Sequence, residues 1–250
     1  MGAGRRILTL SGGWVLDGCV RSLGSRGTVV MSGDMQSDAT SAGGDAFAGR
    51  VSTASFQVRL HGRGGQGTVT GAEMLSVAAF EDGLYAQAFP SFGSERMGAP
   101  VEAYCRIGRS IIRTREPVSQ PDVIIIQDPT LLGQVNLFGG LRNDGFVLIN
   151  SVENVGDLGL GDEVEELRRE RFLSVPATEI AREHLGRTTP NSALLGGFAA
   201  MTGVVSLEAV NAAIRHRFTG ALGEANVAAA AAAYDYVRHE IQEMDHAAAD

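Results

Sequence analysis

The pattern of hydrophobic and polar positions from residue 55 onward switches repeatedly between the period of a strand and that of a helix. Alternating or continuous apolar runs predict strands, whereas apolar residues three and four apart predict helices. The predicted strands are residues 56–60, 85–89, 101–107, 121–128, 145–150 and 172–176. The predicted helices are residues 66–82, 177–185, 191–201, 207–218 and 224–244. Ser206 stands where an N-cap is expected, and Gly186 and Gly203 stand where helices should end.

The order of these elements predicts an α/β fold. Residues 121–128 form a continuous β-branched run, which is typical of a strand buried on both faces. Residues 85–89 and 101–107 read as a long hairpin. We therefore expect a Rossmann-like open mixed sheet flanked by helices, with a β-hairpin insertion and a helical C-terminal third, and ligands at the carboxyl ends of the strands.

The domain organisation follows from where this periodicity begins. Residues 1–54 are rich in Gly, Ser, Asp and Thr and show little periodicity, which predicts a flexible leader. Residues 55–245 are long enough to bury a core of their own. We predict a single α/β domain over residues 55–245.

The most informative motif is a glycine loop between the first predicted strand and helix. Gly62, Gly64 and Gly67 fit the spacing G-x-G-x-x-G, which permits a tight turn, close approach of a ligand and close packing of helix on strand. The free N–H groups of the first helical turn would then face an anion. On spacing alone, a tight turn that binds nothing remains open. The candidate binding residues are Gly62, Arg63, Gly64, Gly65, Gln66, Gly67 and Thr68.

Two features argue against a nucleotide in this loop. An NAD site places an acidic residue about 20 positions after the loop, but residues 84–89 read Leu-Tyr-Ala-Gln-Ala-Phe. A P-loop needs a lysine for the β- and γ-phosphates, and the chain contains no lysine at all. That absence also excludes a Schiff base and a lysine general base.

Composition and charge narrow the class of protein further. The net charge of −8 argues against a nucleic-acid binder, and no apolar run approaches the roughly 20 residues that span a bilayer. We expect a cytoplasmic protein. Cys19 and Cys105 are too few for an iron–sulfur cluster. The five histidines show no paired ligand spacing, so no metal site is predicted, and the sequence offers no catalytic nucleophile motif.

Three segments together resemble a known family. They are His-Gly-Arg-Gly-Gly-Gln-Gly at 61–67, Ala-Phe-Pro-Ser-Phe-Gly-Ser-Glu-Arg-Met-Gly-Ala-Pro-Val at 88–101, and Pro-Asp-Val-Ile-Ile-Ile-Gln-Asp at 121–128. Their order resembles the gamma subunit of 2-oxoacid:ferredoxin oxidoreductases, and Gly-Ala-Pro-Val is most like the pyruvate branch. Residues 190–197 and 224–226 agree, so the resemblance spans about residues 56–240. Ser94 and Met97 depart from the family's usual proline and arginine.

The resemblance implies a role in a multi-subunit enzyme that decarboxylates a 2-oxoacid oxidatively with coenzyme A, giving an acyl-CoA and carbon dioxide. Thiamine diphosphate, magnesium and iron–sulfur clusters would lie in partner alpha, beta and delta or ferredoxin-like subunits, and ferredoxin would accept the electrons. This chain would not be catalytic alone. Its loop at 62–68 would face coenzyme A or a partner, with Arg63 contacting a phosphate. Ser94, Glu95 and Arg96 would fix the neighbouring loop or meet a partner subunit.

Two other classes of protein remain open on the sequence. One is a stand-alone Rossmann-like oxidoreductase that binds NAD or FAD, for which the missing acid near position 87 is the main objection. The other is a purely structural assembly subunit whose glycine loop packs against a partner and contacts no ligand.

Overall fold

A computed structural model gives the fold. It describes residues 6–9, 20–22, 28–31, 55–91, 97–158 and 171–249. The described strands form one mixed sheet in the order β2-β3-β1-β5-β6-β4-β7-β8-β9. The strands are β1 (Arg6–Thr9), β2 (Val20–Ser22), β3 (Thr28–Met31), β4 (Phe56–Arg63), β5 (Tyr85–Pro90), β6 (Pro100–Gly108), β7 (Val123–Ile126), β8 (Phe146–Asn150) and β9 (Phe172–Val175).

The centre of the sheet combines parallel strands with an antiparallel hairpin. Strands β4, β7, β8 and β9 run parallel, as the buried apolar strands predict. β5 and β6 pair antiparallel, with Tyr85 opposite Gly108, which confirms the hairpin. β6 also pairs antiparallel with β4 and therefore separates β4 from β5. The end of β5, where an NAD site would carry its acid, thus lies two strands from the glycine loop.

The helices follow the predicted order and capping. They are α2 (Thr68–Glu81), α3 (Ala177–Leu185), α4 (Asn191–Thr202), α5 (Leu207–Arg217) and α6 (Gly220–Ala249). The Ser206 hydroxyl accepts a hydrogen bond from the Ala209 N–H at 3.1 Å, as expected of an N-cap. Gly186 and Gly203 end α3 and α4 in the left-handed conformation, at φ 63° and 61°.

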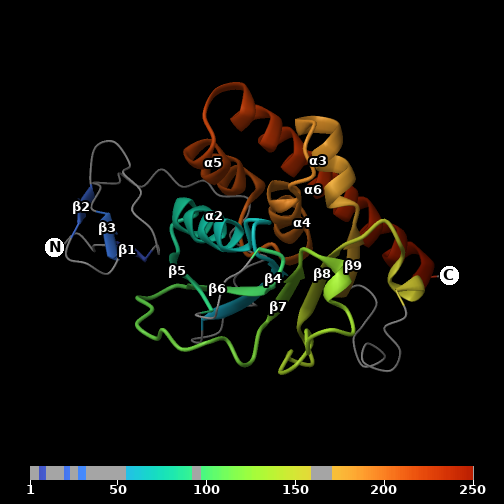
Figure 1. The fold of residues 1–250 in the computed structure, drawn as a ribbon, viewed down its shortest axis with the longest axis horizontal. Helices are drawn as coiled ribbons and strands as arrows, with labels where there is room; N and C mark the ends of the chain where they lie inside the picture. The colour runs from blue at the N-terminus through green and yellow to red at the C-terminus, as the bar shows by residue number, and fades with distance from the viewer. Residues whose placement is uncertain are drawn as a thin grey trace.

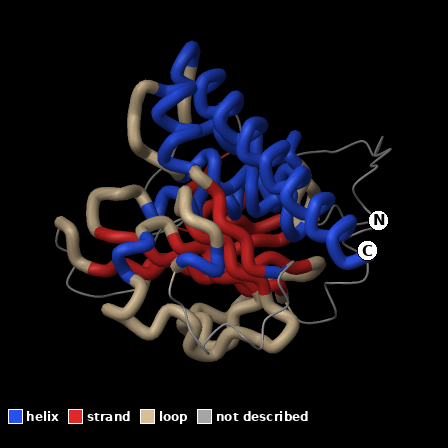
Figure 2. Tube along the Cα trace, turned by 90° about the vertical axis from the view of Figure 1, so that its right-hand side faces the viewer, coloured by secondary structure: helices blue, strands red, loops and turns tan. Residues whose placement is uncertain are grey.

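The helices cover one face of the sheet, and loops cover the other (Figures 1 and 2). The main core lies between the helices and the sheet, where Leu75, Leu195 and Phe198 are fully buried. A smaller core lies on the opposite face, around Ile124 and Ile149, beneath the 3₁₀ helix η1 (Pro129–Leu131) and the loop that follows it. The prediction of an α/β fold with a mixed sheet and a helical C-terminal third is confirmed.

Two buried arginines hold the loops on the face without helices. The Arg59 guanidinium donates to the carbonyls of Leu137 at 2.7 Å and Gly139 at 2.8 Å. The Arg106 guanidinium donates to the Glu116 carbonyl at 2.5 Å. Loops carry backbone carbonyls that no ladder pairs, and a guanidinium offers five donors in a fixed fork. The two arginines therefore fix the loops to this face of the sheet by hydrogen bonds, whereas the other face is covered by packed helices.

Three short strands lie within the region predicted to be a flexible leader. β1 pairs antiparallel with β3 and parallel with β5, where Leu8 stands opposite Ala86. The rest of residues 1–54 lies outside the described residues, so the flexibility of the leader and the boundary at residue 55 stay predictions. In the described part of the chain, no helix combines the length and apolarity needed to cross a membrane.

Candidate functional site

The glycine loop forms a tight turn from β4 into α2. The Gln66 N–H donates to the Arg63 carbonyl at 3.0 Å, which closes a four-residue turn. Gly65 occupies its third position at φ 93°, and Gly67 is the N-cap of α2 at φ 78°. Left-handed backbone of this kind favours glycine because other residues crowd their own carbonyl there. Gly67 has no side chain that could cap α2, so the N–H groups of the first turn depend on other partners.

Close packing explains two of the glycines. A Cβ atom at Gly62 would lie 2.2 Å from the Thr68 hydroxyl and 3.0 Å from the Gln127 side-chain oxygen. A Cβ atom at Gly67 would lie 2.6 Å from the Asn191 side-chain nitrogen. The motif is therefore needed for contacts within the protein as well as for any ligand, because larger residues would displace these polar side chains.

The Arg63 guanidinium is held by the protein on the outer side of the loop. It donates to the Thr130 hydroxyl at 2.8 Å, to the Gly98 carbonyl at 3.1 Å and to the Gln134 side chain at 3.0 Å. Its Nε lies 3.2 Å from an Asp128 carboxylate oxygen. A phosphate would have to compete with these acceptors. The predicted phosphate contact of Arg63 stays a prediction, and its observed role is to tie the loop to η1.

Asp128 joins the same arrangement as an ionised carboxylate. Burial by itself would raise the pKa of Asp128, but hydrogen bonds from Thr130 and Gln66 and the charge of Arg63 outweigh burial and lower that pKa. The Gln66 side-chain amide donates to Asp128 at 2.6 Å, and the Gln66 carbonyl oxygen of the side chain accepts from the Arg63 N–H at 2.8 Å. Gln66 thus links the loop to the end of β7.

Two buried amides close the inner side of the loop. The Gln127 amide nitrogen donates to the Gln66 backbone carbonyl at 2.7 Å and to the Asn191 side-chain oxygen at 2.6 Å. The Thr68 hydroxyl donates to the Gln127 side-chain oxygen at 3.0 Å. The Asn191 amide donates to the backbone carbonyls of Gln66 and Gly67 at 3.3 and 3.2 Å. The first residue of α4 is therefore bonded directly to the start of α2.

Two cavities lie at the carboxyl ends of the parallel strands, where ligands were expected. The smaller one has a volume of about 310 Å³ and is mostly lined by polar residues. Its lining residues are Gly65, Gln66, Gln127, Asp128, Pro129, Asn150, Thr178, Thr188, Thr189 and Pro190. The larger one, of about 550 Å³, shares Pro129, Asn150 and Thr178 with it and continues past Val152 and Leu158 toward α3. The two cavities therefore lie side by side next to the glycine loop, and we refer to them together as the groove.

The end of the second motif, residues 97–101, pairs with the glycine loop. The Gly64 N–H donates to the Ala99 carbonyl at 2.9 Å, and the Gly98 N–H donates to the Gly64 carbonyl at 3.0 Å. Met97 lies over Gly65 with 87% of its surface exposed. The structure thus brings the two motifs side by side. Ser94, Glu95 and Arg96 lie outside the described residues.

Several residues that build the site are not predicted as site residues from the sequence. They are Gln127, Asp128, Asn150, Thr178 and Asn191. A signal for them existed, because Gln127 and Asn150 are the polar residues at which buried strands end, and such positions line ligand sites in open α/β sheets. Apart from Thr130, which donates to Asp128 from two residues away, their side-chain hydrogen-bond partners are between 23 and 125 residues away, so only the fold shows what they contact.

His61, the residue before the loop, is buried and neutral. Burial lowers the pKa of His61 to about 4, and the nearby charges of Glu102, which raises it, and Arg59, which lowers it, have smaller effects. The Arg59 Nε–H donates to His61 Nε2 at 3.0 Å. His61 Nδ1, which faces Glu102 at 3.7 Å, therefore carries the proton.

We expect the depressed pKa of His61 to make stability fall in acid. In the unfolded chain this histidine binds a proton below about pH 6.5. In the folded chain it binds one only below about pH 4. The folded state therefore loses about 3 kcal/mol as pH falls through this window. The free energy of unfolding of His61→Gln should decline less between pH 7.5 and 4.5 than that of the native chain. The exposed His216→Gln is the control, and an NMR titration of His61 near pH 6.5 would contradict the assignment.

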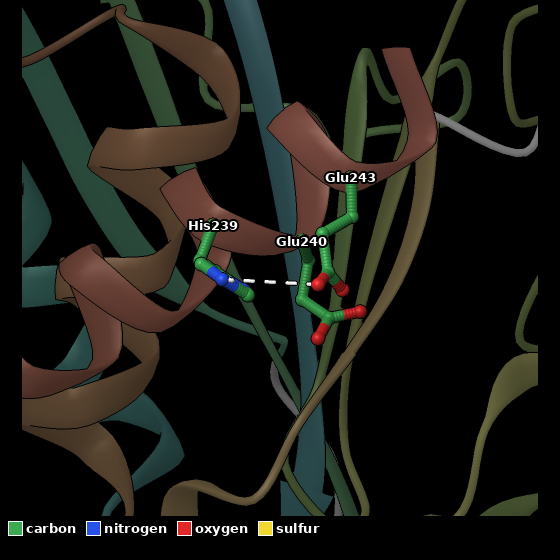
Figure 3. A group of neighbouring side chains, drawn as sticks. All are labelled: His239, Glu240 and Glu243. Atoms are coloured by element: carbon green, nitrogen blue, oxygen red, sulfur yellow. Dashed lines mark ion pairs between the residues drawn. The ribbon is translucent and has the colours of Figure 1, made fainter. Parts of the chain in front are cut away.

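A separate cluster on α6 contains His239, Glu240 and Glu243 (Figure 3). One ligand atom of each lies within 4.8 Å of the others, and His239 Nε2 lies 3.8 Å from a Glu243 oxygen. Figure 3 shows the three side chains projecting from one side of the helix. His239 and Glu243 are exposed, and one turn of a helix brings such residues together without any ion. The spacing of one helical turn therefore accounts for the contact between His239 and Glu243.

Comparison with known proteins gives consistent similarities. The family model described as pyruvate ferredoxin/flavodoxin oxidoreductase matches residues 57–236. The chain is 48% identical over 159 residues to pyruvate synthase subunit PorC of Methanosarcina barkeri, covering 64% of this chain and 84% of that protein. It is 44% identical over 182 residues to the common subunit gamma of the pyruvate/ketoisovalerate oxidoreductases of Pyrococcus abyssi, covering 72% and 96%. The crystal structure of pyruvate oxidoreductase subunit PORC from Thermotoga maritima is similar with a TM-score of 0.61 and 35% identity, covering 73% and 96%.

Proposed function

The chain belongs to the pyruvate ferredoxin/flavodoxin oxidoreductase family, and from this we propose that it is the gamma subunit of a multi-subunit pyruvate:ferredoxin oxidoreductase. In that enzyme it supports the oxidative decarboxylation of pyruvate with coenzyme A to acetyl-CoA and carbon dioxide. The subunit names of its relatives and the match over most of the α/β domain support this role. A stand-alone NAD enzyme has no comparable support.

The division of labour within the enzyme follows from what this chain carries. Iron–sulfur clusters usually take four cysteine thiolates, and the sequence has two cysteines. Cys105 is fully buried in β6, where burial raises the pKa of its thiol. We therefore assign the clusters to partner subunits, and with them thiamine diphosphate and magnesium, over the alpha, beta and delta subunits. We further propose ferredoxin as the electron acceptor and the cytoplasm as the location. Ser94, Glu95 and Arg96 are proposed to meet one of these partners.

Coenzyme A is the ligand that we propose for the groove beside the glycine loop. The observation that carries the proposal is the loop itself, which turns into α2 without a side-chain cap at the edge of a polar cavity. Helix N-termini and successive glycine N–H groups bind phosphate. Coenzyme A is long, with phosphates at one end and an extended thiol arm, and the two adjacent cavities suit such a molecule. The charge of Asp128 is offset by Arg63 at 3.2 Å.

Arg63→Ala tests this assignment in the assembled enzyme. Removing a guanidinium that ties the loop to η1, and that can also contact phosphate, removes charge-assisted hydrogen bonds worth about 1.5 kcal/mol. We expect the KM for coenzyme A to rise about tenfold, while the KM for pyruvate stays unchanged. The measurement is steady-state kinetics with coenzyme A as the varied substrate.

Arg142→Ala is the matched control for Arg63→Ala. Arg142 is also a partly exposed arginine in an ion pair, with Asp122 at 3.3 Å, but it lies at the opposite end of β7. Its removal should leave the KM for coenzyme A within about twofold. An equal KM for Arg63→Ala and the native enzyme would instead favour a purely structural subunit whose loop only packs against a partner.

A further inference from the structure

We propose that Gln127 and Asn191 are positioning residues that lock the glycine loop with its N–H groups turned toward the ligand. The inference rests on the proposed coenzyme A site and assigns the groups that orient it. Both side chains are buried, with 4% and 8% of their surfaces exposed. They are bonded to each other at 2.6 Å, and both donate to backbone carbonyls of the loop.

The lock works through the planarity of the peptide bond. In a trans peptide the carbonyl of one residue and the N–H of the next point in opposite directions. The Gln66 carbonyl is held inward by both amides, so the Gly67 N–H points to the opposite side of the loop. The Gly67 carbonyl accepts from Asn191 and from the Gly71 N–H, so the Thr68 N–H also points away from the lock. Two donors at the N-terminus of α2 thus point away from the two amides, next to Gly65 and Gln66, which line the cavity.

Without the two amides this orientation is weakly determined. Gly67 has no Cβ and adopts φ 78°, and glycine accepts either orientation of the preceding peptide at little cost. A flipped peptide would turn the Gln66 carbonyl outward, where its partial negative charge repels an anion. The Thr68 hydroxyl fixes Gln127 in turn, because it donates to the Gln127 oxygen and so directs the Gln127 nitrogen at the loop.

The side chain of Asn191 makes no hydrogen bond that closes the first turn of its own helix, α4. Asn191 is the first residue of α4, whose first turn closes through the Leu194 N–H and the Pro190 carbonyl at 2.9 Å. The packing of α4 on its neighbours comes from apolar residues such as Leu195 and Phe198. The amide of Asn191 is therefore directed entirely across to the loop and to Gln127, as expected of a residue that orients a site.

The test is Asn191→Ala in the assembled enzyme, with Ser192→Ala as matched control. Ser192 is the next residue of α4, is 1% exposed, and donates one buried hydrogen bond to Asn226 at 2.8 Å. Both variants lose a buried polar group from the same turn, but only Asn191→Ala frees the loop. We expect Asn191→Ala to raise the KM for coenzyme A about tenfold at unchanged kcat and unchanged KM for pyruvate. Ser192→Ala should change none of these by more than about twofold.

Gln127→Met is the second variant, in case Asn191→Ala fails to assemble. Methionine keeps the volume of glutamine but removes its donors and acceptor. It should raise the KM for coenzyme A as much as Asn191→Ala, and the double variant should raise it no further because the amides act as one unit. Direct titration of the enzyme with coenzyme A should show the same loss of affinity.

The outcomes separate the lock from the proposed function. Asn191→Ala and Gln127→Met could raise the KM for coenzyme A no more than Ser192→Ala does, while Arg63→Ala still raises it. In that case the positioning role of Gln127 and Asn191 is wrong, and the proposal of a coenzyme A site is retained. If none of the four variants changes that KM, coenzyme A does not bind this loop, and both proposals fall.

Discussion

Replacing Gly196 by alanine should destabilise the chain more than any other single methyl group added to α4. A Cβ atom at Gly196 would lie 2.0 Å from the Ala230 carbonyl oxygen, and 2.7 and 2.9 Å from the Ala230 carbonyl carbon and Cα. These are backbone atoms of α6, so no side chain can turn aside, and the two helices must move apart. We expect a loss of about 3 kcal/mol after the gain in helix propensity. In a domain of this size the midpoint of thermal unfolding should fall by roughly 10 °C.

The adjacent Gly197→Ala provides the control for this prediction. The nearest atoms to a Cβ at Gly197 are methyl groups of Leu148 and Val237, both at 3.4 Å. Methyl groups can shift by a few tenths of an ångström, and alanine favours a helix over glycine by up to about 1 kcal/mol. The thermal midpoint of Gly197→Ala should therefore stay within about 3 °C of the native chain. Equal midpoints for the two variants would show that α4 and α6 do not approach at Gly196.

The largest effect on activity is expected from Gly67→Ala. A Cβ at Gly67 adds left-handed strain at φ 78° and meets the Asn191 nitrogen at 2.6 Å, so the loop or Asn191 must move. Strain of about 1–2 kcal/mol combined with the displaced amide should cost roughly 2–3 kcal/mol in the productive loop conformation. We expect kcat/KM for coenzyme A to fall about 30- to 150-fold. Steady-state kinetics of the assembled enzyme measures it.

Gly186→Ala separates backbone strain from the effect on the site. Gly186 ends α3 at φ 63°, also in the left-handed region, and a Cβ there would meet nothing within 4 Å. Its substitution should lower stability by about 1 kcal/mol and leave kcat/KM for coenzyme A within about twofold. A comparable loss of activity in both variants would mean that global destabilisation, and not the geometry of the loop, accounts for Gly67→Ala.

The element boundaries show how far local sequence signals reach. Helix α3 covers residues 177–185 as predicted, because its capping signals are local. Helix α2 begins at Thr68 instead of residue 66, since Gln66 is needed to close the turn with the Arg63 carbonyl. Strand β7 covers residues 123–126 instead of 121–128, because Gln127 and Asp128 leave the strand to bind the glycine loop. The departures at residues 66 and 127–128 fall at the site, where tertiary contacts outweigh local preference. Helix α6 departs elsewhere, since it covers Gly220–Ala249 instead of the predicted residues 224–244.

The sequence by itself determined the class of fold, the family and the position of the glycine loop. These depend on periodicity, on turn-forming residues and on motifs that are short in sequence, so they can be read without the fold. The tertiary structure alone decided that β6 lies between β4 and β5, that Arg63 faces η1, and that Gln127 and Asn191 meet behind the loop. Hydrogen bonds join residues up to 125 positions apart in this site. No local pattern encodes such partners, because they meet only when the sheet and α4 have packed.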